Sequence, residues 1–426
     1  MRTETGVASS PSVNAAEMLR ITPDEFAGRT TRLRAKLREK DVDALIAFAS
    51  RAEHGDVRYL TGFEPWLIPE QWAVAVVLQD ATSEVSLITN SPWNFAWPEF
   101  APKLWINDIV LPRPRQDASG VADSSVLPPW MGIDWADPIL ERLPTQARRV
   151  AVAGWHSFPT PLFRELTTRA PRLTFSDGTG LLRELRMIKT TGEVALLRFA
   201  GTIADAAGRA FFEAVGPGVT EREVCAAVDA AMMCAGTEQL AYWTNLAAGR
   251  RTLVSCFLPT ERMLKDGDIV QLDCGPMVDG YKADFSRVIV VGTGSPLADR
   301  LVETVASAYS ECAAALKPGV ECADIARTGL RVVRANGYGD ENMYLSPYDP
   351  QLLFMGHGIG LENPDPPGML SLKNHAVLEE GMVINLEPIL LDAEVGAGRI
   401  ESAFVITARG ATPLSATNIR PRKPEQ

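Results

Sequence analysis

The sequence predicts two domains: an α/β domain, then a second domain that combines long helices with a strand-rich C-terminal half. Helix-like and strand-like patterns alternate from about Thr22 to Arg169, and a long helical pattern from Glu193 to Ala214 opens the second part. We expect residues 1–20 to form a disordered tail, 21–181 the first domain and 182–426 the second. With 426 residues, 46% of them hydrophobic, the chain is long enough for two buried cores.

The first domain is predicted to begin with a helix. Residues 23–40 have an amphipathic pattern, and Thr22 is a suitable N-cap. Further apolar and helical patterns predict strands at 44–48, 73–78 and 149–153 and a helix near 161–169. Residues 111–138 are rich in Pro, Ser, Asp and Gly, which predicts a long surface excursion.

The second domain is predicted to contain two similar helix junctions. After the helix at 193–214, the segment Gly216-Pro-Gly-Val-Thr-Glu-Arg-Glu-Val224 ends one helix and starts another. Thr220 as N-cap with Glu223 three residues later forms a capping box. A weaker copy, Lys317-Pro-Gly-Val-Glu-Cys-Ala-Asp324, follows a helix-like stretch at 299–316.

Composition argues against some classes of partner and indicates the cellular compartment. The net charge of −11 argues against nucleic acid or an anionic membrane as partner. There is no apolar run of 18 residues, so we expect no membrane span. The first 13 residues lack the apolar core of a signal peptide, and the six cysteines form no Cys-x-x-Cys pair. We therefore expect a cytoplasmic protein with reduced cysteines that acts on a small molecule.

Five side chains in the C-terminal half are candidate metal ligands: Asp273, Asp284, His357, Glu387 and Glu401. The two aspartates are 284 − 273 = 11 residues apart, which suits a hairpin with facing carboxylates. Each acid lies in apolar strand-like sequence, where burying several carboxylates is costly unless a cation neutralises them. Four acids and one imidazole suit two divalent ions such as Mn, Fe, Co or Zn. The alternative is a set of salt-bridged acids at strand ends.

The segments around these residues carry a family resemblance. They read Asp273-Cys-Gly-Pro-Met-Val-Asp-Gly-Tyr-Lys-Ala-Asp284, Met355-Gly-His-Gly-Ile-Gly360, Val383-Ile-Asn-Leu-Glu-Pro388 and Gly398-Arg-Ile-Glu-Ser402. This set resembles the pita-bread metallohydrolases of peptidase family M24, which include methionine aminopeptidase, prolidase, aminopeptidase P and creatinase. The layout is most similar to the two-domain creatinase and prolidase type, because Asp56-Val-Arg-Tyr-Leu-Thr-Gly-Phe63 resembles the opening of the creatinase N-terminal domain.

The resemblance implies a fold and a set of roles. It implies a creatinase-like α/β N-terminal domain and an α+β pita-bread catalytic domain, in which two helix pairs back a curved antiparallel sheet. Asp273 would be a terminal ligand of one ion, His357 and Glu387 would bind the other, and Asp284 and Glu401 would bridge them. Glu387 would also shuttle the proton of the attacking water. The resemblance further implies a homodimer.

The chain departs from the family's peptidases at two positions. These peptidases carry two additional histidines that contact the scissile peptide, and here Cys256 and Pro364 stand in their places. Proline donates neither a proton nor a hydrogen bond. The nearby Asn363 and Asp365 are therefore candidates for contacting the substrate, and Cys256 is either inert packing or a further substrate contact.

Aromatic residues are a further group of candidate substrate contacts: Trp66, Trp93 and Trp97 in the first domain and Tyr242 and Trp243 in the second. Indole faces attract small cations by about 0.5–2 kcal/mol. The alternative is that most of these tryptophans pack in the core or in an interface.

Three activities remain open at this point. The first is a binuclear, divalent-metal-dependent hydrolase that uses an activated water to cleave an amide or related C–N bond of a small amino-acid derivative, including cationic ones. The second is an Xaa-Pro dipeptidase or aminopeptidase. The third is a metal-dependent lyase acting on a sulfonium or betaine-like substrate, similar to the dimethylsulfoniopropionate lyase of the same fold.

Overall fold

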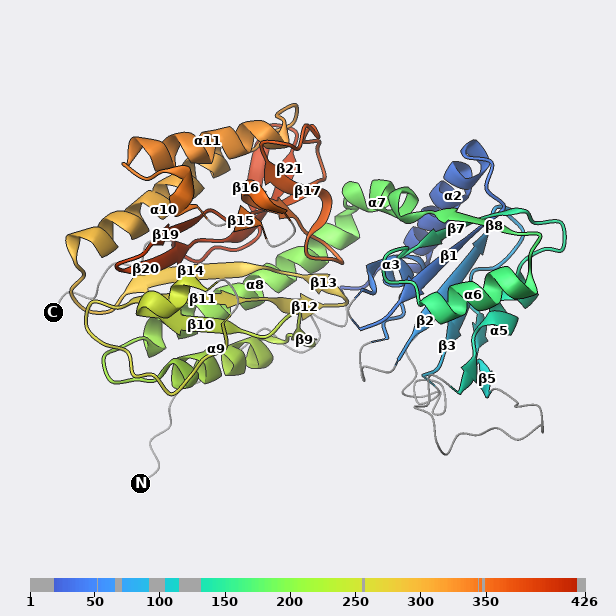
Figure 1. Ribbon diagram of the computed structural model, residues 1–426, viewed down its shortest axis with the longest axis horizontal. Helices are drawn as coiled ribbons and strands as arrows, with labels where there is room; N and C mark the ends of the chain where they lie inside the picture. The colour runs from blue at the N-terminus through green and yellow to red at the C-terminus, as the bar shows by residue number, and fades with distance from the viewer. Residues whose placement is uncertain are drawn as a thin grey trace, which may run out of the picture. The chain divides into compact units, whose positions relative to one another are not determined.

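The structure is a computed structural model that describes residues 19–51, 53–65, 71–91, 104–114, 132–254, 257–343, 345–346 and 349–419. It divides into two compact units, Ile21–Arg186 and Met187–Gln426 (Figure 1). The boundary expected from the sequence, between 181 and 182, lies inside helix α7 (Thr179–Met187), and the units divide near the end of that helix. Within the described residues, no helix is long and apolar enough to cross a membrane.

The first unit combines short helices with one sheet. Its other helices are α2 (Pro23–Glu39), α3 (Gly55–Thr61), α5 (Ala136–Arg142) and α6 (Thr160–Arg169). Its strands are β1 (Ala44–Ala49), β2 (Ala73–Leu78), β3 (Ser86–Thr89), β4 (Asp108–Val110), β5 (Arg113–Pro114), β6 (Ile133–Asp134), β7 (Arg149–Ala153) and β8 (Thr174–Asp177). The helices and strands predicted at 23–40, 44–48, 73–78, 149–153 and 161–169 are confirmed. Thr22 caps α2 by accepting a hydrogen bond from the Glu25 backbone N–H.

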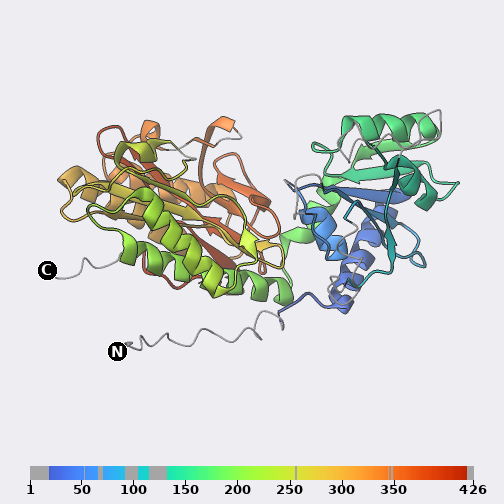
Figure 2. The ribbon, with the colours of Figure 1, turned by 90° about the horizontal axis from the view of Figure 1, so that it is seen from below.

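Six strands form a mixed sheet in the order β4-β3-β2-β1-β7-β8. The central strand β1 pairs antiparallel with β2 and parallel with β7. Helices lie on both sides of the sheet (Figure 2), which is why all six residues of β1 are buried. Ile46 and Phe48 pack in one core cluster with α5 and α6, while their neighbour Leu45 is also fully buried.

The predicted surface excursion at 111–138 is wrong at its C-terminal end, and residues 115–131 lie outside the described part of the chain. Strands β5 and β6 pair with each other, and α5 begins at Ala136. Trp135 is buried, and its ring lies 5.6 Å from that of Trp72. The Pro and Asp residues of this stretch suggested a loop, but tertiary burial of an aromatic side chain outweighs local turn preference.

Among its described residues, the second unit contains four long helices and a larger number of strands. Its helices are α8 (Thr191–Ala214), α9 (Glu221–Ala235), α10 (Pro296–Ala315) and α11 (Cys322–Ala335), and its 3₁₀ turns are η1 (Gly249–Leu253) and η2 (Asp340–Asn342). Its strands are β9 (Gln239–Leu240), β10 (Asn245–Ala248), β11 (Ile269–Cys274), β12 (Pro276–Val278), β13 (Tyr281–Lys282), β14 (Phe285–Val290), β15 (Leu345–Ser346), β16 (Asp349–Gly358), β17 (Asp365–Ser371), β18 (Val383–Leu386), β19 (Ile389–Asp392), β20 (Gly396–Arg399), β21 (Ser402–Thr407) and β22 (Gly410–Pro413).

The helices of this unit form two consecutive pairs, α8 with α9 and α10 with α11. The predicted capping box of Thr220 and Glu223 is confirmed at the start of α9. Thr190 and Glu193 form a second capping box, so α8 begins at Thr191 rather than at Glu193 as predicted. The copy at 317–324 is weaker in the structure too, since Glu321 at the start of α11 makes no side-chain cap.

The strands of the second unit pair antiparallel, and two of its sheets meet at one bridge. Strand β11 lies between β10 and β14, and β18 lies between β16 and β21. An isolated antiparallel bridge between Ser286 and Glu401 connects these two sheets. It brings the start of β14 next to the start of β21, where two of the candidate ligands lie.

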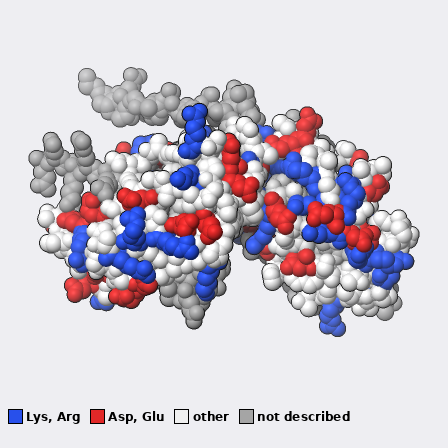
Figure 3. Space-filling view, turned by 90° about the horizontal axis from the view of Figure 1, so that it is seen from above, with Lys and Arg blue, Asp and Glu red and all other residues white. Residues whose placement is uncertain are grey.

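Charged side chains are mixed on the surface. On the face shown in Figure 3, Lys and Arg are interspersed with Asp and Glu among the described residues. This distribution fits the argument from net charge, because nucleic-acid binding favours an extended basic area.

Candidate metal centre

The five candidate ligands come from the ends and interiors of neighbouring strands. Asp273 lies in β11, and Asp284 immediately precedes β14. His357 lies in β16 opposite Asn385 of β18. The remaining ligands, Glu387 and Glu401, follow β18 and precede β21. Antiparallel pairing therefore brings together side chains that are up to 401 − 273 = 128 residues apart.

A glycine permits the close approach of two of these strands. Gly356 precedes His357 and has a φ of +144°, a conformation that other residues rarely adopt. A Cβ atom at this position would lie 2.0 Å from the backbone oxygen of Asn385. Any larger residue would push β16 away from β18 and move His357.

His357 faces three of the four acids. Its Nε2 lies 3.5 Å from Asp284 Oδ2, 3.5 Å from Glu387 Oε2 and 3.7 Å from Glu401 Oε1. The other ring nitrogen, Nδ1, lies 2.9 Å from the carbonyl oxygen of Gly358. Because a carbonyl only accepts hydrogen bonds, Nδ1 carries the proton when the ring is neutral, and the lone pair of Nε2 points to the acids.

Arg399 joins the remaining acid to this group. Its Nη1 lies 2.6 Å from Asp273 Oδ2, 3.1 Å from Glu387 Oε1 and 3.8 Å from Glu401 Oε2. Arg399 stands in the segment Gly398-Arg-Ile-Glu-Ser402, but its role was not predicted from the sequence. The signal was present, because residues two apart in extended sequence share a face.

Further donors hold the carboxylates in place. The Tyr242 hydroxyl contacts both aspartates, at 2.7 Å from Asp273 Oδ1 and closer to Asp284 Oδ1. Asn363 donates to Asp284 Oδ2 over 2.6 Å. Glu401 accepts from Ser286 and from the amide of Asn385, each over 2.6 Å. The group is thus oriented by a surrounding layer of hydrogen bonds, as metal ligands usually are.

Burial changes the proton affinities of the acids. All five candidate ligands are buried. Burial raises the pKa of Glu387 from 4.5 to about 7, and it raises the pKa of Asp273 to about 6, although Arg399 lowers both. Burial and the Asp284 and Glu387 carboxylates raise the pKa of Glu401 well above its ordinary value.

The other two members shift toward their charged forms. Burial alone would raise the pKa of Asp284, but its hydrogen bond and charge interaction with His357 lower that pKa overall. Burial alone would lower the pKa of His357, but Asp284, Glu401 and Glu387 raise it well above 6.5. In the absence of a metal ion, the imidazolium therefore acts as a counter-charge for the acids.

The geometry of this group fits a metal ion. Oxygen and nitrogen ligands about 2.1 Å from one ion in a tetrahedral arrangement lie about 3.4 Å from one another. The separations of 3.5–3.7 Å between His357 Nε2 and three carboxylate oxygens match this value and exceed ordinary hydrogen-bond lengths. Ligand atoms of Asp284, His357 and Glu401 all lie within 4.8 Å of one another. This group can hold a metal ion.

The charges of the group favour cations as well. Four buried carboxylates face one guanidinium and one imidazole, which leaves an excess of negative charge. Divalent ions are the natural counter-charge for such a set of hard oxygen ligands.

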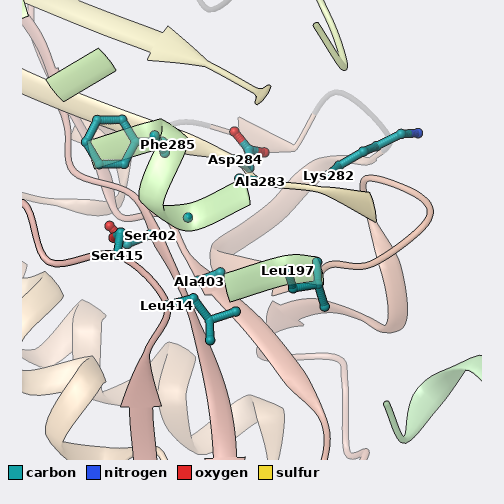
Figure 4. A pocket seen from close by; sticks show the side chains of 11 residues that line it. Leu197, Lys282, Ala283, Asp284, Phe285, Ser402, Ala403, Leu414 and Ser415 are labelled. Atoms are coloured by element: carbon teal, nitrogen blue, oxygen red, sulfur yellow. The ribbon is translucent and has the colours of Figure 1, made fainter. Parts of the chain in front are cut away.

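A small cavity lies behind Asp284 and is not a substrate pocket. Its volume is about 10 Å³, close to the space of one water molecule. Figure 4 shows its lining, with Leu197 from α8, Ala403 from β21 and Leu414 around Asp284 and Phe285. The cavity is a packing gap between the sheet and α8.

The predicted substrate contacts have different environments. Asp365 forms a buried ion pair with Lys189 at 3.3 Å. Trp243 is 77% exposed and directly follows Tyr242, whose hydroxyl binds the candidate ligands. The remaining predicted contacts lie outside the described residues: Cys256, Trp66, Trp93 and Trp97.

Comparisons with known proteins identify the family of the chain. Residues 195–408 match the model of metallopeptidase family M24, and residues 29–188 match the creatinase/prolidase N-terminal domain. Over 237 residues the chain is 33% identical to the Xaa-Pro dipeptidase of Pyrococcus furiosus, covering 56% of this chain and 65% of that protein. Over 261 residues it is 31% identical to the Xaa-Pro dipeptidase of Pyrococcus horikoshii, covering 61% of this chain and 72% of that protein.

A solved structure extends the likeness to nearly the whole fold. The prolidase from Pyrococcus horikoshii OT3 superimposes with a TM-score of 0.75 over 92% of this chain and 99% of that chain, at 24% sequence identity. The expected α/β N-terminal domain and α+β pita-bread domain are thus confirmed. The chain belongs to the metallopeptidase family M24, in its two-domain form with a creatinase/prolidase N-terminal domain.

Proposed function

We propose that the chain is a hydrolase that uses two divalent metal ions to cleave the amide bond of an Xaa-Pro dipeptide. The main support for metal binding is that His357 lies close to Asp284, Glu387 and Glu401, at separations that suit ligands of a shared ion. The Xaa-Pro dipeptidases among its relatives support this substrate class, which was the second of the three activities left open by the sequence.

The ligand set is the one expected from the resemblance. In this assignment Asp273 would be a terminal ligand of one ion, His357 and Glu387 would bind the other, and Asp284 and Glu401 would bridge the two. When bound, two ions lower the pKa of a water molecule and polarise the scissile carbonyl. Manganese, iron, cobalt and zinc all accept these oxygen and nitrogen donors.

Glu387 is the proposed general base and acid. It lies 3.5 Å from His357 and 3.1 Å from Arg399, and burial raises its pKa to about 7. A carboxylate with a pKa near neutrality can take a proton from water and return it to the leaving amine.

A second candidate function is hydrolysis of another small amide. It is favoured by Cys256 and Pro364, which stand where the family's peptidases carry histidines. The lost donors would weaken recognition of a peptide backbone and leave room for a different amino-acid derivative, including a cationic one that aromatic faces attract. Elimination from a sulfonium or betaine-like compound is the lyase alternative.

We further propose that the chain acts in the cytoplasm as a homodimer, as the resemblance implies. In that assembly Trp66, Trp93 and Trp97 of one subunit would line the pocket of the other, beside Tyr242 and Trp243. Light scattering on the purified protein tests the dimer, and a monomer at micromolar concentration would refute it.

Metal analysis followed by a substrate panel tests the function. Elemental analysis of the purified protein should find two divalent ions per chain. The manganese-loaded protein should then cleave Xaa-Pro dipeptides within the usual kcat range of about 1–10³ s⁻¹. His357→Ala should abolish turnover, whereas the same exchange at His375, which is exposed and paired with Glu321, should not.

Other results separate the alternatives. Two bound ions without dipeptide cleavage, but with turnover of another amide or of a sulfonium compound, would refute the dipeptidase and support the corresponding alternative. In that case Cys256→His with Pro364→His should create dipeptidase activity if the missing histidines are the barrier. A protein that turns over substrate without any metal would refute the whole proposal.

A further inference from the structure

Asn363 lies in the loop between β16 and β17 and contacts the candidate metal centre. The hydrolysis proposed above gives this side chain no role. The loop at 359–364 connects β16 to β17, and Asn363 precedes Pro364, which stands in place of the family's second histidine. The Asn363 amide lies 2.6 Å from Asp284 Oδ2. Because a carboxylate only accepts hydrogen bonds, the NH₂ group must be the end of the amide that faces Asp284.

The two oxygens of Asp284 have separate side-chain partners. Asn363 binds Oδ2, and the Tyr242 hydroxyl contacts Oδ1. Each carboxylate oxygen has two lone-pair directions. Asn363 thus occupies one lone-pair direction of Oδ2, and the same oxygen faces His357 Nε2 at 3.5 Å, where the candidate ligands converge. Without the hydrogen bond from Asn363, the Asp284 carboxylate would be free to rotate, and its oxygens would no longer be held in the direction of the other candidate ligands.

The loop is anchored on both sides of Asn363. On one side, the Lys282 backbone N–H donates to the carbonyl of Gly360, and the Lys282 side chain pairs with Glu362 at 2.9 Å. On the other side, Asp365 pairs with the buried Lys189 at 3.3 Å. The side chain of Asn363 is therefore held at Asp284 by a braced loop and loses little conformational entropy when it binds.

We propose that Asn363 is a positioning residue that orients the Asp284 carboxylate for the metal ions. This inference rests on the proposed metal centre and gives Asn363 a role different from the substrate contact expected from the sequence. Removing a hydrogen-bond partner of a metal ligand typically weakens metal affinity about 10- to 100-fold. Asn363 acts through Asp284, so its loss should change metal binding before it changes substrate binding.

Direct metal binding tests this role. Asn363→Leu removes the donor but keeps the approximate volume, and Asn363→Ala removes it without the risk of overpacking the loop. Chelator competition should give an Mn²⁺ or Co²⁺ dissociation constant about 10- to 100-fold higher for both variants than for the wild-type protein. The visible absorption spectrum of the Co²⁺-loaded protein should shift as well, because the coordination of Asp284 changes.

A neighbouring variant separates the Asn363 amide from the loop that carries it. Glu362→Gln weakens one anchor of the loop, the contact with Lys282, but keeps the amide of Asn363 and the anchors at Gly360 and Asp365. Its metal affinity should stay within about threefold of the wild-type value, and circular dichroism should show all variants folded. If only one Asn363 variant folds, that variant decides the test.

Three outcomes would overturn the inference. Wild-type metal affinity and an unchanged Co²⁺ spectrum in a folded Asn363 variant would remove the positioning role. A raised KM with unchanged metal affinity would return Asn363 to the substrate contact. A wild-type protein that binds no metal would refute the proposed function itself. This failure can be told apart from failure of the Asn363 inference, because it is seen with the wild-type protein alone.

Discussion

The two units of the molecule bury charge in different ways. In the first unit, buried ions are matched closely, as in the pair of Arg186 with Asp56 at 2.7 Å. In the second unit, four carboxylates share Arg399 and His357 within the described part of the chain. A matched pair needs no further ion, but an excess of buried carboxylates is costly without a cation. The first unit therefore buries charge in balanced pairs, whereas the second holds an excess of carboxylates that a bound cation would balance.

Removing a ligand should have the largest effect. Glu401→Gln keeps the shape of the side chain but removes a charge from the centre of the group, where the residue is fully buried. We expect a loss of bound metal by elemental analysis and a loss of activity of at least about 10²-fold, more than for a partner of a ligand. The same exchange at the exposed Glu380 should change neither. Full metal content in Glu401→Gln would contradict the assigned ligand set.

A core substitution in the first unit should lower the free energy of unfolding and leave the metal content unchanged. Leu45→Ala empties a fully buried position in the central strand β1. We expect a loss of about 2–5 kcal/mol in the free energy of unfolding from chemical denaturation, with metal content unchanged. Leu111→Ala, at a residue that is 47% exposed, should cost less than about 0.5 kcal/mol. A loss of metal in Leu45→Ala would mean that metal binding by the second unit depends on the packing of the first.

The metal-free protein should lose stability as pH rises. In the folded state the pKa of Glu387 is raised from 4.5 to about 7, and that of Asp273 to about 6, so the folded protein binds more protons than the unfolded one in this range. Stability therefore falls between about pH 4.5 and about pH 7. The raised pKa of His357 acts in the same direction, while the lowered pKa of Asp284 matters only below its ordinary value.

Melting temperatures measure this effect. Chelator-treated protein should melt at a lower temperature at each step up in pH, and added metal should raise the melting temperature most at the highest pH. Glu387→Gln should flatten the dependence, because it removes one of the titrating groups. A melting temperature of the metal-free protein that increases through this range would contradict the excess of buried carboxylates.

The smallest effect should come from the two helix pairs of the second unit. Thr220→Ala removes the capping box of α9 and should cost about 1 kcal/mol. Glu321→Ala should cost less, because this residue gives α11 no side-chain cap and makes only an exposed contact with His375. Chemical denaturation of the two variants gives the comparison, and equal losses would show that the second junction is stabilised in another way.

Much of the fold could be predicted from local sequence. Strand β1 is a continuous apolar run, the boundaries of α2 follow from Thr22 and the amphipathic pattern, and the start of α9 follows from Thr220 and Glu223. These features are set by residues within a few positions of one another. The C-terminal end of the excursion predicted at 111–138 was wrong for the same reason, since its local composition gave no sign that Trp135 packs against Trp72.

The candidate site was only partly predictable. The sequence by itself determined which side chains are available as ligands, because carboxylates and a histidine in apolar strands have few other uses. Only the tertiary structure decided that Arg399 reaches three of these acids and that Tyr242 and Asn363, both expected to contact substrate, bind Asp284. Contacts between Asn363 and Asp284 cross 363 − 284 = 79 residues. Such contacts depend on strand pairing and on the anchoring of the loop. The local sequence of either segment predicts neither of these.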